Sequence, residues 1–341
     1  MRDMNFASGG ILALSKSSEN RDVASILVSL VIPMYNERDG LEMLLGSIEK
    51  ALASQAIAYE VVCIDDGSTD DTFSALVKMG DKRVRVFRLS RNYGKEIALS
   101  AGLDLAKGDV VIPLDADLQE PPELIPVMLD KWSQGFDVVV AVRRSRETDG
   151  AVKAASAKFF YKFFNTVSDS KIPENAGDFR LLDRHVVDVL RQMPERNRFM
   201  KGLLSWPGFR CAQIEFDRPE RYCGQSKWKP VKLLGLAVDG LTSFSILPLR
   251  MASVLGGCMS LGAFAYGLFV VSKRFFWGDP VQGYASLMAS MLFLGGVQLL
   301  ALGIVGEYIG RIYIETKRRP LYVVMDSNDN NIARKDEQDV V

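Results

Sequence analysis

Two acidic residues, Asp115 and Asp117, stand one residue apart directly after a short apolar run, Val110 to Leu114. At the end of a strand, two carboxylates in this spacing can converge on one hard cation, and the amide oxygen of Gln119 could join them. Mg²⁺ or Mn²⁺ favours such oxygen ligands and keeps coordination sites open for phosphate oxygens. Taken alone, an Asp-X-Asp pair is more often a solvated turn than a metal site, so its surroundings decide the interpretation.

Polar motifs also follow the three apolar runs that precede this one. VIPMYNE (residues 31–37) ends the first run, IDDGSTD (64–70) ends the second, and RNYGKE (91–96) follows the third. The Gly-Ser-Thr of the second motif would suit a turn and a helix N-cap. A cap does not explain the adjacent acids Asp65 and Asp66, so we expect this motif to serve both as a cap and as a binding site.

Short apolar runs alternate with amphipathic segments from Leu27 to Arg143. The runs predicted as strands are Leu27 to Ile32, Glu60 to Ile64, Val84 to Leu89, Val110 to Leu114 and Val138 to Val142. The segments predicted as helices are Leu41 to Ala53, Thr72 to Met79, Glu96 to Ala106 and Glu123 to Trp132. Nearly all-apolar strands are typical of a parallel sheet covered on both faces, and their alternation with helices predicts a doubly wound α/β domain.

The polar motifs fall at the carboxyl ends of four consecutive predicted strands, where sheets of this kind bind ligands. We therefore expect them to meet at one rim of the sheet. Further along, residues 152–164 are predicted to form an amphipathic helix and residues 210–218 a half-buried strand. The lone histidine, His185, lies in an amphipathic helical pattern and is interpreted as a helix-surface residue without a catalytic role.

The chain has 341 residues, with 42 basic and 42 acidic side chains and a formal net charge of zero. That balance argues against bulk electrostatic attraction to nucleic acid. The four cysteines form no CxxC pair and no zinc-ligand spacing, so we interpret them as reduced thiols in a cytosolic compartment. Residues 1–25 are rich in Ser, Asn and charge, and they are predicted to be a mobile leader instead of a signal peptide.

The last third of the chain contains two long uncharged stretches. Residues 251–271 and 281–306 carry no charged side chain. Each run can span a membrane, which takes about 20 apolar residues; a buried helical hairpin in a soluble core is the alternative. Residues 229–247 have one apolar helical face, which suits a helix lying in a membrane interface or a buried amphipathic helix. Basic residues flank the outer ends of both runs, so the positive-inside rule places both termini and the α/β domain in the cytoplasm.

The combination of motifs is more specific than any one of them. Beside the three already named stand DADLQEPP (115–122), GDFRL (177–181) and GQSKW (224–228). Together they resemble glycosyltransferase family 2, which has the GT-A fold, and specifically the polyprenyl-phosphate branch that includes dolichol-phosphate mannose synthase. One catalytic domain followed by two spans looks most like bacterial bactoprenol glucosyltransferases of the GtrB type. The resemblance covers residues 27–320, nearly the whole chain outside its two tails.

The resemblance implies a role for each matching residue. Metal binding would fall to Asp115, Asp117 and Gln119, and catalysis to Asp178, Asp117 and Arg143. Substrate binding would fall to Pro33, Tyr35, Glu37, Asp65, Asp66, Lys95, Asp115, Ala116, Arg143, Arg180, Arg198 and Lys227. A departing nucleoside diphosphate gathers negative charge, which a metal ion with Arg or Lys stabilises, so the residue types fit the same chemistry.

Asp178 would orient or deprotonate the acceptor. Because an acceptor phosphate is already largely ionised at neutral pH, we expect Asp178 to position the acceptor or the sugar more than to move a proton; capping a turn is the structural alternative. Arg143, Arg180 and Arg198 could together hold a lipid phosphate, because guanidinium offers planar bidentate donors. With a single histidine, direct displacement is favoured over a covalent enzyme intermediate, and it inverts the anomeric centre.

The implied reaction is inverting transfer of glucose from UDP-glucose to undecaprenyl phosphate at the cytoplasmic face of the inner membrane. GDP-mannose, UDP-N-acetylglucosamine or a UDP-arabinose derivative remain open as donors. A processive polysaccharide synthase and a catalytically silent membrane scaffold are the alternatives, although the chain lacks a QxxRW motif and keeps the Asp115/Asp117 pair. Family likeness favours a homotetramer.

The expected division of the chain follows from these patterns. It comprises a leader (1–25), a GT-A catalytic domain (26–226), a juxtamembrane amphipathic helix (227–249), two transmembrane helices (250–272 and 281–307) and a cytoplasmic tail (308–341).

Overall fold

The computed structural model describes most of the chain. The described residues are 21–53, 57–144, 176–193, 195–196, 198, 200–217, 247–277 and 283–329. The predicted helix at 152–164, the predicted interfacial helix at 229–247 except its last residue, and the predicted substrate ligand Lys227 lie outside this part of the chain.

A mixed sheet of eight strands, in the order β7-β5-β6-β4-β1-β2-β3-β8, forms the centre of the domain. Its strands are β1 (Leu27–Met34), β2 (Ala58–Asp65), β3 (Val84–Leu89), β4 (Val110–Pro113), β5 (Val138–Arg143), β6 (Ala176–Asp183), β7 (Cys211–Phe216) and β8 (Val324–Ser327). Strands β3, β2, β1 and β4 run parallel to one another, and β5 pairs parallel with β7. The antiparallel members are β6 and β8.

The five strands predicted before residue 143 are confirmed, with ends that shift by one or two residues. Their continuous apolar runs arise because helices cover both faces of the sheet. The half-buried strand expected at 210–218 is β7, in which buried and exposed side chains alternate. Strand β6 was not predicted. The helix expected around His185 begins at Arg184, because Leu182 belongs to the strand.

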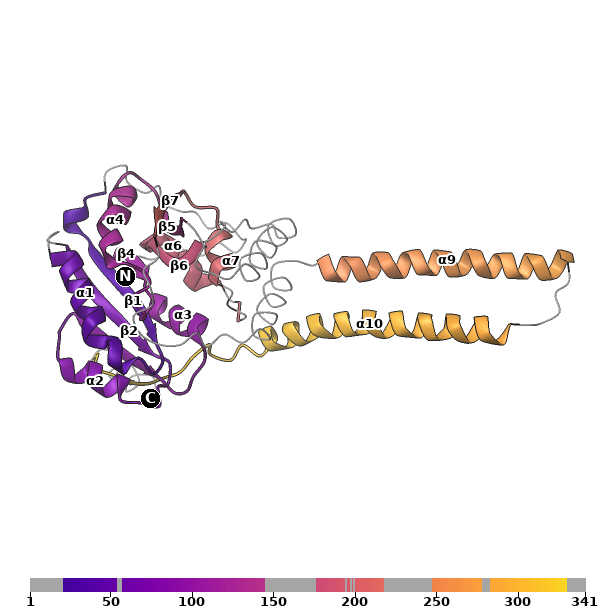
Figure 1. Ribbon diagram of the computed structural model, residues 1–341, viewed down its shortest axis with the longest axis horizontal. Coiled ribbons are helices and arrows are strands. Elements are labelled where there is room, and N and C mark those ends of the chain that lie inside the picture. Colours follow the sequence, from indigo (N-terminus) through magenta and orange to yellow (C-terminus); the bar gives the residue numbers. More distant parts are fainter. Residues whose placement is uncertain are drawn as a thin grey trace, which may run out of the picture.

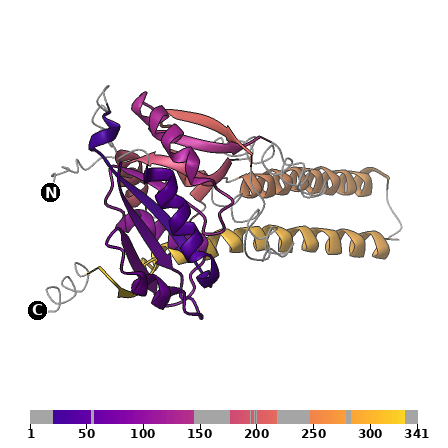
Figure 2. The same ribbon diagram turned by 60° about the vertical axis from the view of Figure 1, so that its left-hand side comes forward.

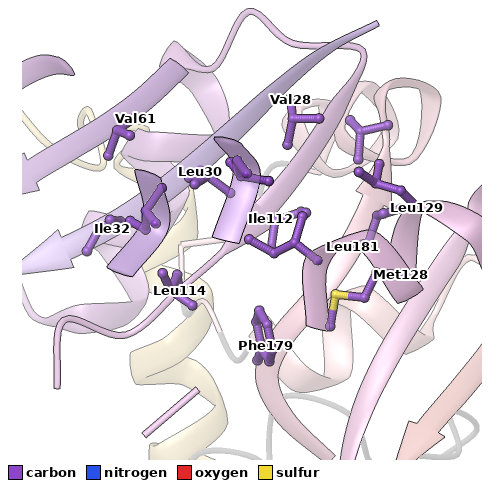
Figure 3. Close-up of a cluster of buried hydrophobic side chains, with 14 of the residues drawn as sticks. Val28, Leu30, Ile32, Val61, Ile112, Leu114, Met128, Leu129, Phe179 and Leu181 are labelled. Carbon is purple, nitrogen blue, oxygen red and sulfur yellow. The ribbon is translucent and has the colours of Figure 1, made fainter. Parts of the chain in front are cut away.

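Two layers of helices enclose the sheet. One face packs against α1 (Leu41–Ala53), α2 (Thr72–Met79) and α4 (Ile125–Ser133), and the core there includes the ten labelled side chains of Figure 3. The other face packs against α3 (Lys95–Leu105), α6 (Arg184–Gln192) and α7 (Met200–Ser205). Short 3₁₀ turns at Val23–Ser25, Arg38–Gly40 and Pro122–Leu124 precede β1, α1 and α4.

Helical periodicity explains how these helices dock. In α1, the buried residues Leu41, Leu44, Ile48 and Leu52 recur every three or four positions and form one apolar stripe. In α4, Ile125, Met128, Leu129 and Trp132 do the same. Both stripes face the sheet, so each helix is held by burial of its side chains against β-strand side chains.

Two long helices leave this domain side by side, as both views show (Figure 1 and Figure 2). They are α9 (Leu247–Trp277) and α10 (Tyr284–Thr316), and they contain the windows Met251–Phe269 and Phe293–Thr316, which are long and apolar enough to cross a membrane. No described residue of either window is buried inside the protein. An apolar core helix of a soluble protein would be mostly buried, so these helices differ from one.

Both ends of the described chain are more structured than the sequence suggested. Residues 21–25 were expected to belong to a mobile leader, but the Arg21 side chain is 4% exposed and its guanidinium lies 2.8 Å from the Asp137 carboxylate. In the segment expected to be a cytoplasmic tail, α10 continues to Thr316 and β8 joins the edge of the sheet beside β3. The Arg21–Asp137 ion pair and the β3–β8 pairing join residues far apart in the chain, which local sequence patterns do not reveal.

Candidate functional site

The carboxyl ends of the parallel strands form one rim of the sheet, and β6 brings a further acid to it. Because β6 is antiparallel to β4, its first residues lie where β4 ends. The pairing joins Val110 to Asp183 and Val111 to Leu182. Asp178 is the third residue of β6, and Asp115 follows the last residue of β4 by two positions, so both acids lie at this rim. The topology therefore brings the predicted metal ligand and the predicted acceptor-positioning residue together.

Lys95 joins these two acids. Its Nζ lies 2.7 Å from Oδ1 of Asp115 and 2.7 Å from Oδ2 of Asp178. Lys95 is the first residue of α3, which follows the glycine N-cap Gly94, whose φ is +97°. The start of α3 thus carries its positive side chain to the rim. This ion-paired group contains three of the residues that the sequence predicted for the site.

The pKa of Lys95 depends on the two carboxylates beside it. Burial alone would lower the pKa of Lys95, but the carboxylates of Asp178 and Asp115 raise it well above its ordinary value. Lys95 is therefore a permanent cation at neutral pH, although 41% of its side chain remains exposed. The rim holds two anions that need a neighbouring positive charge, and in this arrangement Lys95 supplies it.

Glu120 is a member of the site to which the sequence assigned no role. The residue is buried, and its Oε2 accepts a hydrogen bond of 2.8 Å from the backbone N–H of Asp115. Burial, followed by the nearby charge of Asp115, raises the pKa of Glu120 well above its ordinary value. The signal in the sequence was an acid directly before Pro121-Pro122 in the same motif, at a position that can reach back to the start of the loop.

The loop after β4 is tightly turned around its acids. Leu118 adopts a left-handed conformation with φ of +56°, which is uncommon for a residue other than glycine. The backbone N–H of Gln119 donates to Oδ1 of Asp117 over 3.2 Å. Within the described part of the chain, the buried Oε1 of Gln119 has no hydrogen-bond partner. A buried oxygen in that state costs free energy unless a ligand satisfies it.

The loops after β1 and β2 are locked to each other. Asn36, with φ of +55°, accepts a 2.9 Å hydrogen bond from the N–H of Thr69 through Oδ1, and its own N–H donates to Ser68 Oγ. Asp65 is fully buried and accepts from the Ser68 N–H over 2.9 Å. The motif predicted to be both cap and binding site therefore forms a double loop with the segment after β1. Gly67 lies so near the next loop that a Cβ there would come within 2.6 Å of the carbonyl carbon of Arg91.

Asp66 connects this double loop to Lys95. Its Oδ1 accepts from the N–H of Tyr93 over 2.7 Å, and its Oδ2 accepts from the N–H of Gly94 over 2.8 Å. Burial raises the pKa of Asp66 above its ordinary value, against the effect of these two hydrogen bonds. Both carboxylate oxygens hold the turn that begins α3. The structure thus gives Asp66 a positioning contact toward Lys95 in addition to the binding role that the resemblance implies.

Five further predicted ligands lie at or just after the carboxyl ends of strands. Pro33, Tyr35 and Glu37 lie at or just after the end of β1, Ala116 lies between the two loop acids, and Arg143 is the last residue of β5. All of these positions are at the rim.

Two of the predicted arginines have different environments. Arg180, on β6, is buried, its Nη2 donates to the Gly177 carbonyl over 2.6 Å, and burial lowers its pKa although Asp178 opposes that effect. Arg198 instead donates to the carbonyls of Leu190 and Met193 at the end of α6. Asp104, whose charge acts on Arg198, lies nine residues along α3 from Lys95, or about 14 Å of helix. The structure does not bring Arg198 into the Lys95 group.

Comparison with known proteins gives matches over both parts of the chain. Residues 29–191 match the model described as Glycosyl transferase family 2, and residues 247–312 match the GtrB C-terminal hairpin. An uncharacterized glycosyltransferase of Synechocystis sp. is 51% identical over 304 residues, which cover 89% of this chain and 96% of that protein. The bactoprenol glucosyl transferase of Shigella phage SfII is 46% identical over 306 residues, covering 89% of this chain and 99% of its own.

Among solved structures, mannosyl-3-phosphoglycerate synthase from Rubrobacter xylanophilus aligns with a TM-score of 0.44 and 19% identity, over 63% of this chain and 71% of that one. This structural similarity is distant. The matches that matter for the chain are therefore those of sequence, which extend from the sheet domain into the helical hairpin.

Proposed function

Since the chain belongs to glycosyltransferase family 2, we propose that it transfers glucose from UDP-glucose to a polyprenyl phosphate, undecaprenyl phosphate, with inversion at the anomeric carbon. The observation that carries this proposal is the 46% identity to a bactoprenol glucosyl transferase over 99% of that protein. The likeness includes the apolar hairpin as well as the sheet domain, so it concerns the whole arrangement of catalytic domain and membrane anchor.

The loop after β4 fits a divalent cation, Mg²⁺ or Mn²⁺. Asp115 and Asp117 offer carboxylate oxygens, and Gln119 offers a buried amide oxygen without a hydrogen-bond partner in the described chain. Within the described ranges, no three His, Cys, Asp or Glu side chains are arranged to hold a metal ion. Two carboxylates and one amide would therefore need oxygens from the donor diphosphate, which is the open coordination that nucleotide-sugar chemistry requires.

When bound, the cation would neutralise charge on the diphosphate leaving group. A phosphate oxygen of the acceptor attacks the anomeric carbon, and the bond from that carbon to the nucleoside diphosphate breaks on the opposite side. Because the attacking phosphate is already largely ionised, the step needs no strong base. Asp178, held 2.7 Å from Lys95, is then suited to orienting a substrate more than to removing a proton.

Positive side chains around the rim would complete the stabilisation of phosphate charge. Lys95 at the start of α3 and Arg143 at the end of β5 are the described candidates, with Lys227 outside the described residues. The proposed nucleotide-binding site is the double loop that contains Asn36, Asp65 and Ser68. Pro33 and Tyr35 lie beside it. Preorganised charges of this kind favour the transition state because they need no rearrangement during the reaction.

The lipid acceptor explains the hairpin. A polyprenyl phosphate keeps its headgroup at the bilayer surface, and α9 and α10 expose apolar windows of sufficient length to be embedded there. We propose that both helices span the inner membrane with the sheet domain on the cytoplasmic side, following the basic outer flanks. Anchoring confines the search for acceptor to the neighbourhood of a plane. A homotetrameric assembly stays a prediction from family likeness.

The deciding experiment uses the purified full-length chain in vesicles with undecaprenyl phosphate and radiolabelled nucleotide-sugars. Label from UDP-glucose is expected in the organic phase, in the presence of Mg²⁺ or Mn²⁺ and not in chelator. Label from GDP-mannose, UDP-N-acetylglucosamine or a UDP-arabinose derivative instead would correct the donor. Polymer in the aqueous phase would favour a processive synthase. Absence of label from every donor would favour a catalytically silent scaffold.

A further inference from the structure

After α10, the chain returns to the sheet through residues 317–329, which we call the C-terminal strap. Strand β8 of the strap pairs antiparallel with β3, joining Phe87 to Ser327 and Leu89 to Val324. It begins at the carboxyl end of β3, where the Ser90 N–H donates to the Val323 carbonyl over 2.9 Å. The strap therefore reaches the sheet at the rim that carries the candidate site.

Its far end is anchored in a partly buried polar network. The side chain of Asn328 accepts from the Val86 N–H over 2.7 Å and donates to the Val84 carbonyl over 3.0 Å. Asp329 lies 2.8 Å from the Arg85 guanidinium, and both side chains are nearly buried. Arg85 also pairs with Glu60 at 2.9 Å. Ion pairs with little exposure cost more to break than surface pairs, so this is a strong attachment for a short edge strand.

Further contacts fix the segment where the strap leaves the membrane helix. Near the end of α10, Glu315 Oε1 accepts from the Arg196 N–H over 2.8 Å. Within the strap, the Tyr322 hydroxyl donates to Asp104 on α3 over 3.0 Å, and Tyr322 packs against the core on that face of the sheet. Only residues 316–321 separate these two attachments. The connection between helix and domain is short and held at both ends.

A chain of contacts leads from the strap to the site. Val323 holds Ser90 at the start of the loop 90–94, and Asp66 holds Tyr93 and Gly94 at its end. The next residue is Lys95, which contacts Asp115 and Asp178. Both ends of this loop are thus fixed by hydrogen bonds, one of them from the strap.

From these contacts we infer that the C-terminal strap is a positioning element for transfer to a membrane-bound acceptor. It holds β3, the loop 90–94 and Lys95 at a fixed place relative to the end of α10, so that the rim meets a phosphate group at the bilayer surface. This inference rests on the proposed function for its acceptor. Misplacement of reacting groups by about 1 Å can cost about 100-fold in rate, so a rigid connection has a direct kinetic value.

The test lengthens the connection without removing the strand. Insertion of Gly-Ser-Gly-Ser between Arg319 and Pro320 keeps every residue of β8 and its anchors, and the same insertion after Asp336 is the matched control. In vesicles, transfer to undecaprenyl phosphate is expected to fall at least about 10-fold with the first insertion. Transfer to a short-chain, water-soluble polyprenyl phosphate is expected to stay within about twofold, because that acceptor needs no fixed height above the bilayer. Unchanged transfer to the long-chain acceptor, or an equal loss with both acceptors, would overturn the inference.

A second readout is independent of sugar transfer. Spin labels at the exposed positions Thr316 and Asn92, with the other cysteines replaced, report the distance from the end of α10 to the loop 90–94. A narrow distance distribution is expected in the parent and the control, and a broad one with the insertion after Arg319. Equally narrow distributions in all three would overturn the inference. A parent chain that transfers sugar to neither acceptor would refute the proposed function, while the distances would still decide the role of the strap.

Discussion

The carboxylates of Asp115 and Asp178 share the ammonium of Lys95, at 2.7 Å from each. Asp178 lies on β6, and Asp115 lies in the loop that follows the neighbouring antiparallel strand β4. The lysine comes from the first turn of a helix on one face of the sheet. Two anions at this separation repel each other unless a cation stands between them. A divalent ion that binds Asp115 must therefore compete with Lys95 or shift it toward Asp178 and the incoming phosphates.

Replacement of either loop acid is expected to abolish metal-dependent transfer. In Asp115→Ala or Asp117→Ala, sugar transfer to undecaprenyl phosphate should fall at least about 100-fold, because stabilisation of the leaving diphosphate is lost. Radiolabel in the organic phase measures transfer, and electron paramagnetic resonance measures Mn²⁺ binding. Asp130→Ala, at an exposed acid of α4, is the control. Undiminished transfer by the Asp115 variant, or by the parent chain in chelator, would refute the metal assignment.

Removal of the Lys95 ammonium should change metal binding and turnover in opposite directions. In Lys95→Met, Mn²⁺ is expected to bind about 10-fold more tightly in the absence of nucleotide, because a positive charge 2.7 Å from a metal ligand is gone. Sugar transfer should nevertheless fall, since the same charge is proposed to stabilise the phosphates. Lys95→Arg, which keeps the charge, should bind Mn²⁺ as the parent does. Weaker Mn²⁺ binding by Lys95→Met would contradict the competition between the two cations.

The turn at Gly67 should tolerate no side chain. Its φ is +66°, and a Cβ there would lie 2.6 Å from the carbonyl carbon of Arg91. Gly67→Ala is expected to lower the free energy of unfolding by about 1–3 kcal/mol and to weaken nucleotide binding, as measured by thermal unfolding and calorimetry. Gly46→Ala is the matched control. In α1 a Cβ at that position meets nothing within 4 Å, so alanine should stabilise the helix by about 1 kcal/mol.

The buried side chain of Arg21 should contribute to the stability of the fold. Arg21 is 4% exposed, pairs with Asp137 at 2.8 Å and lies over the ring of Trp132. Arg21→Met leaves a carboxylate without its buried partner and is expected to cost about 3–5 kcal/mol, read as a loss in melting temperature. Arg144→Met breaks a surface pair whose arginine is 61% exposed, and should cost less than about 1 kcal/mol. Equal effects of the two substitutions would show that Arg21 is not structurally required.

Glu120 should give the metal-free protein a pH-dependent stability. Burial and the charge of Asp115 raise the pKa of Glu120 well above its ordinary value of 4.5. At pH values between 4.5 and the raised pKa, the unfolded chain releases a proton that the folded protein keeps. The contribution of Glu120 to stability therefore falls as pH rises toward neutrality. Glu120→Gln still accepts from Asp115 but does not ionise.

The stability of Glu120→Gln relative to the parent is therefore expected to increase between about pH 4.5 and 7. Thermal unfolding across this range measures the difference, with exposed Glu123→Gln as the control for the loss of one carboxyl group. A difference that does not change with pH would mean that Glu120 titrates alike in the folded and unfolded states.

Strand β6 escaped sequence analysis, although its candidate site residues Asp178 and Arg180 did not. A buried strand is recognised by a continuous apolar run, but Gly177, Asp178 and Arg180 interrupt the run in β6. Asp178 stands at the rim, so a residue that could carry function also conceals the strand. Strand β8 escaped for another reason: four residues, Val324 to Ser327, at the edge of a sheet leave no periodic pattern to detect.

The amino-acid sequence by itself determined the parallel strands, the helices between them, the apolar hairpin, the family resemblance and the acids of the loop after β4. Each of these can be recognised from residues close together in the sequence. For strands and helices, burial of one or both faces makes apolar side chains recur at regular intervals. Tertiary structure alone decided that β6 runs beside β4, that Lys95 joins Asp115 and Asp178, that Arg198 caps α6 instead, and that the strap returns to β3. Such pairings join residues far apart in the chain, and their register depends on hydrogen bonds and ion pairs that form only when the sheet assembles.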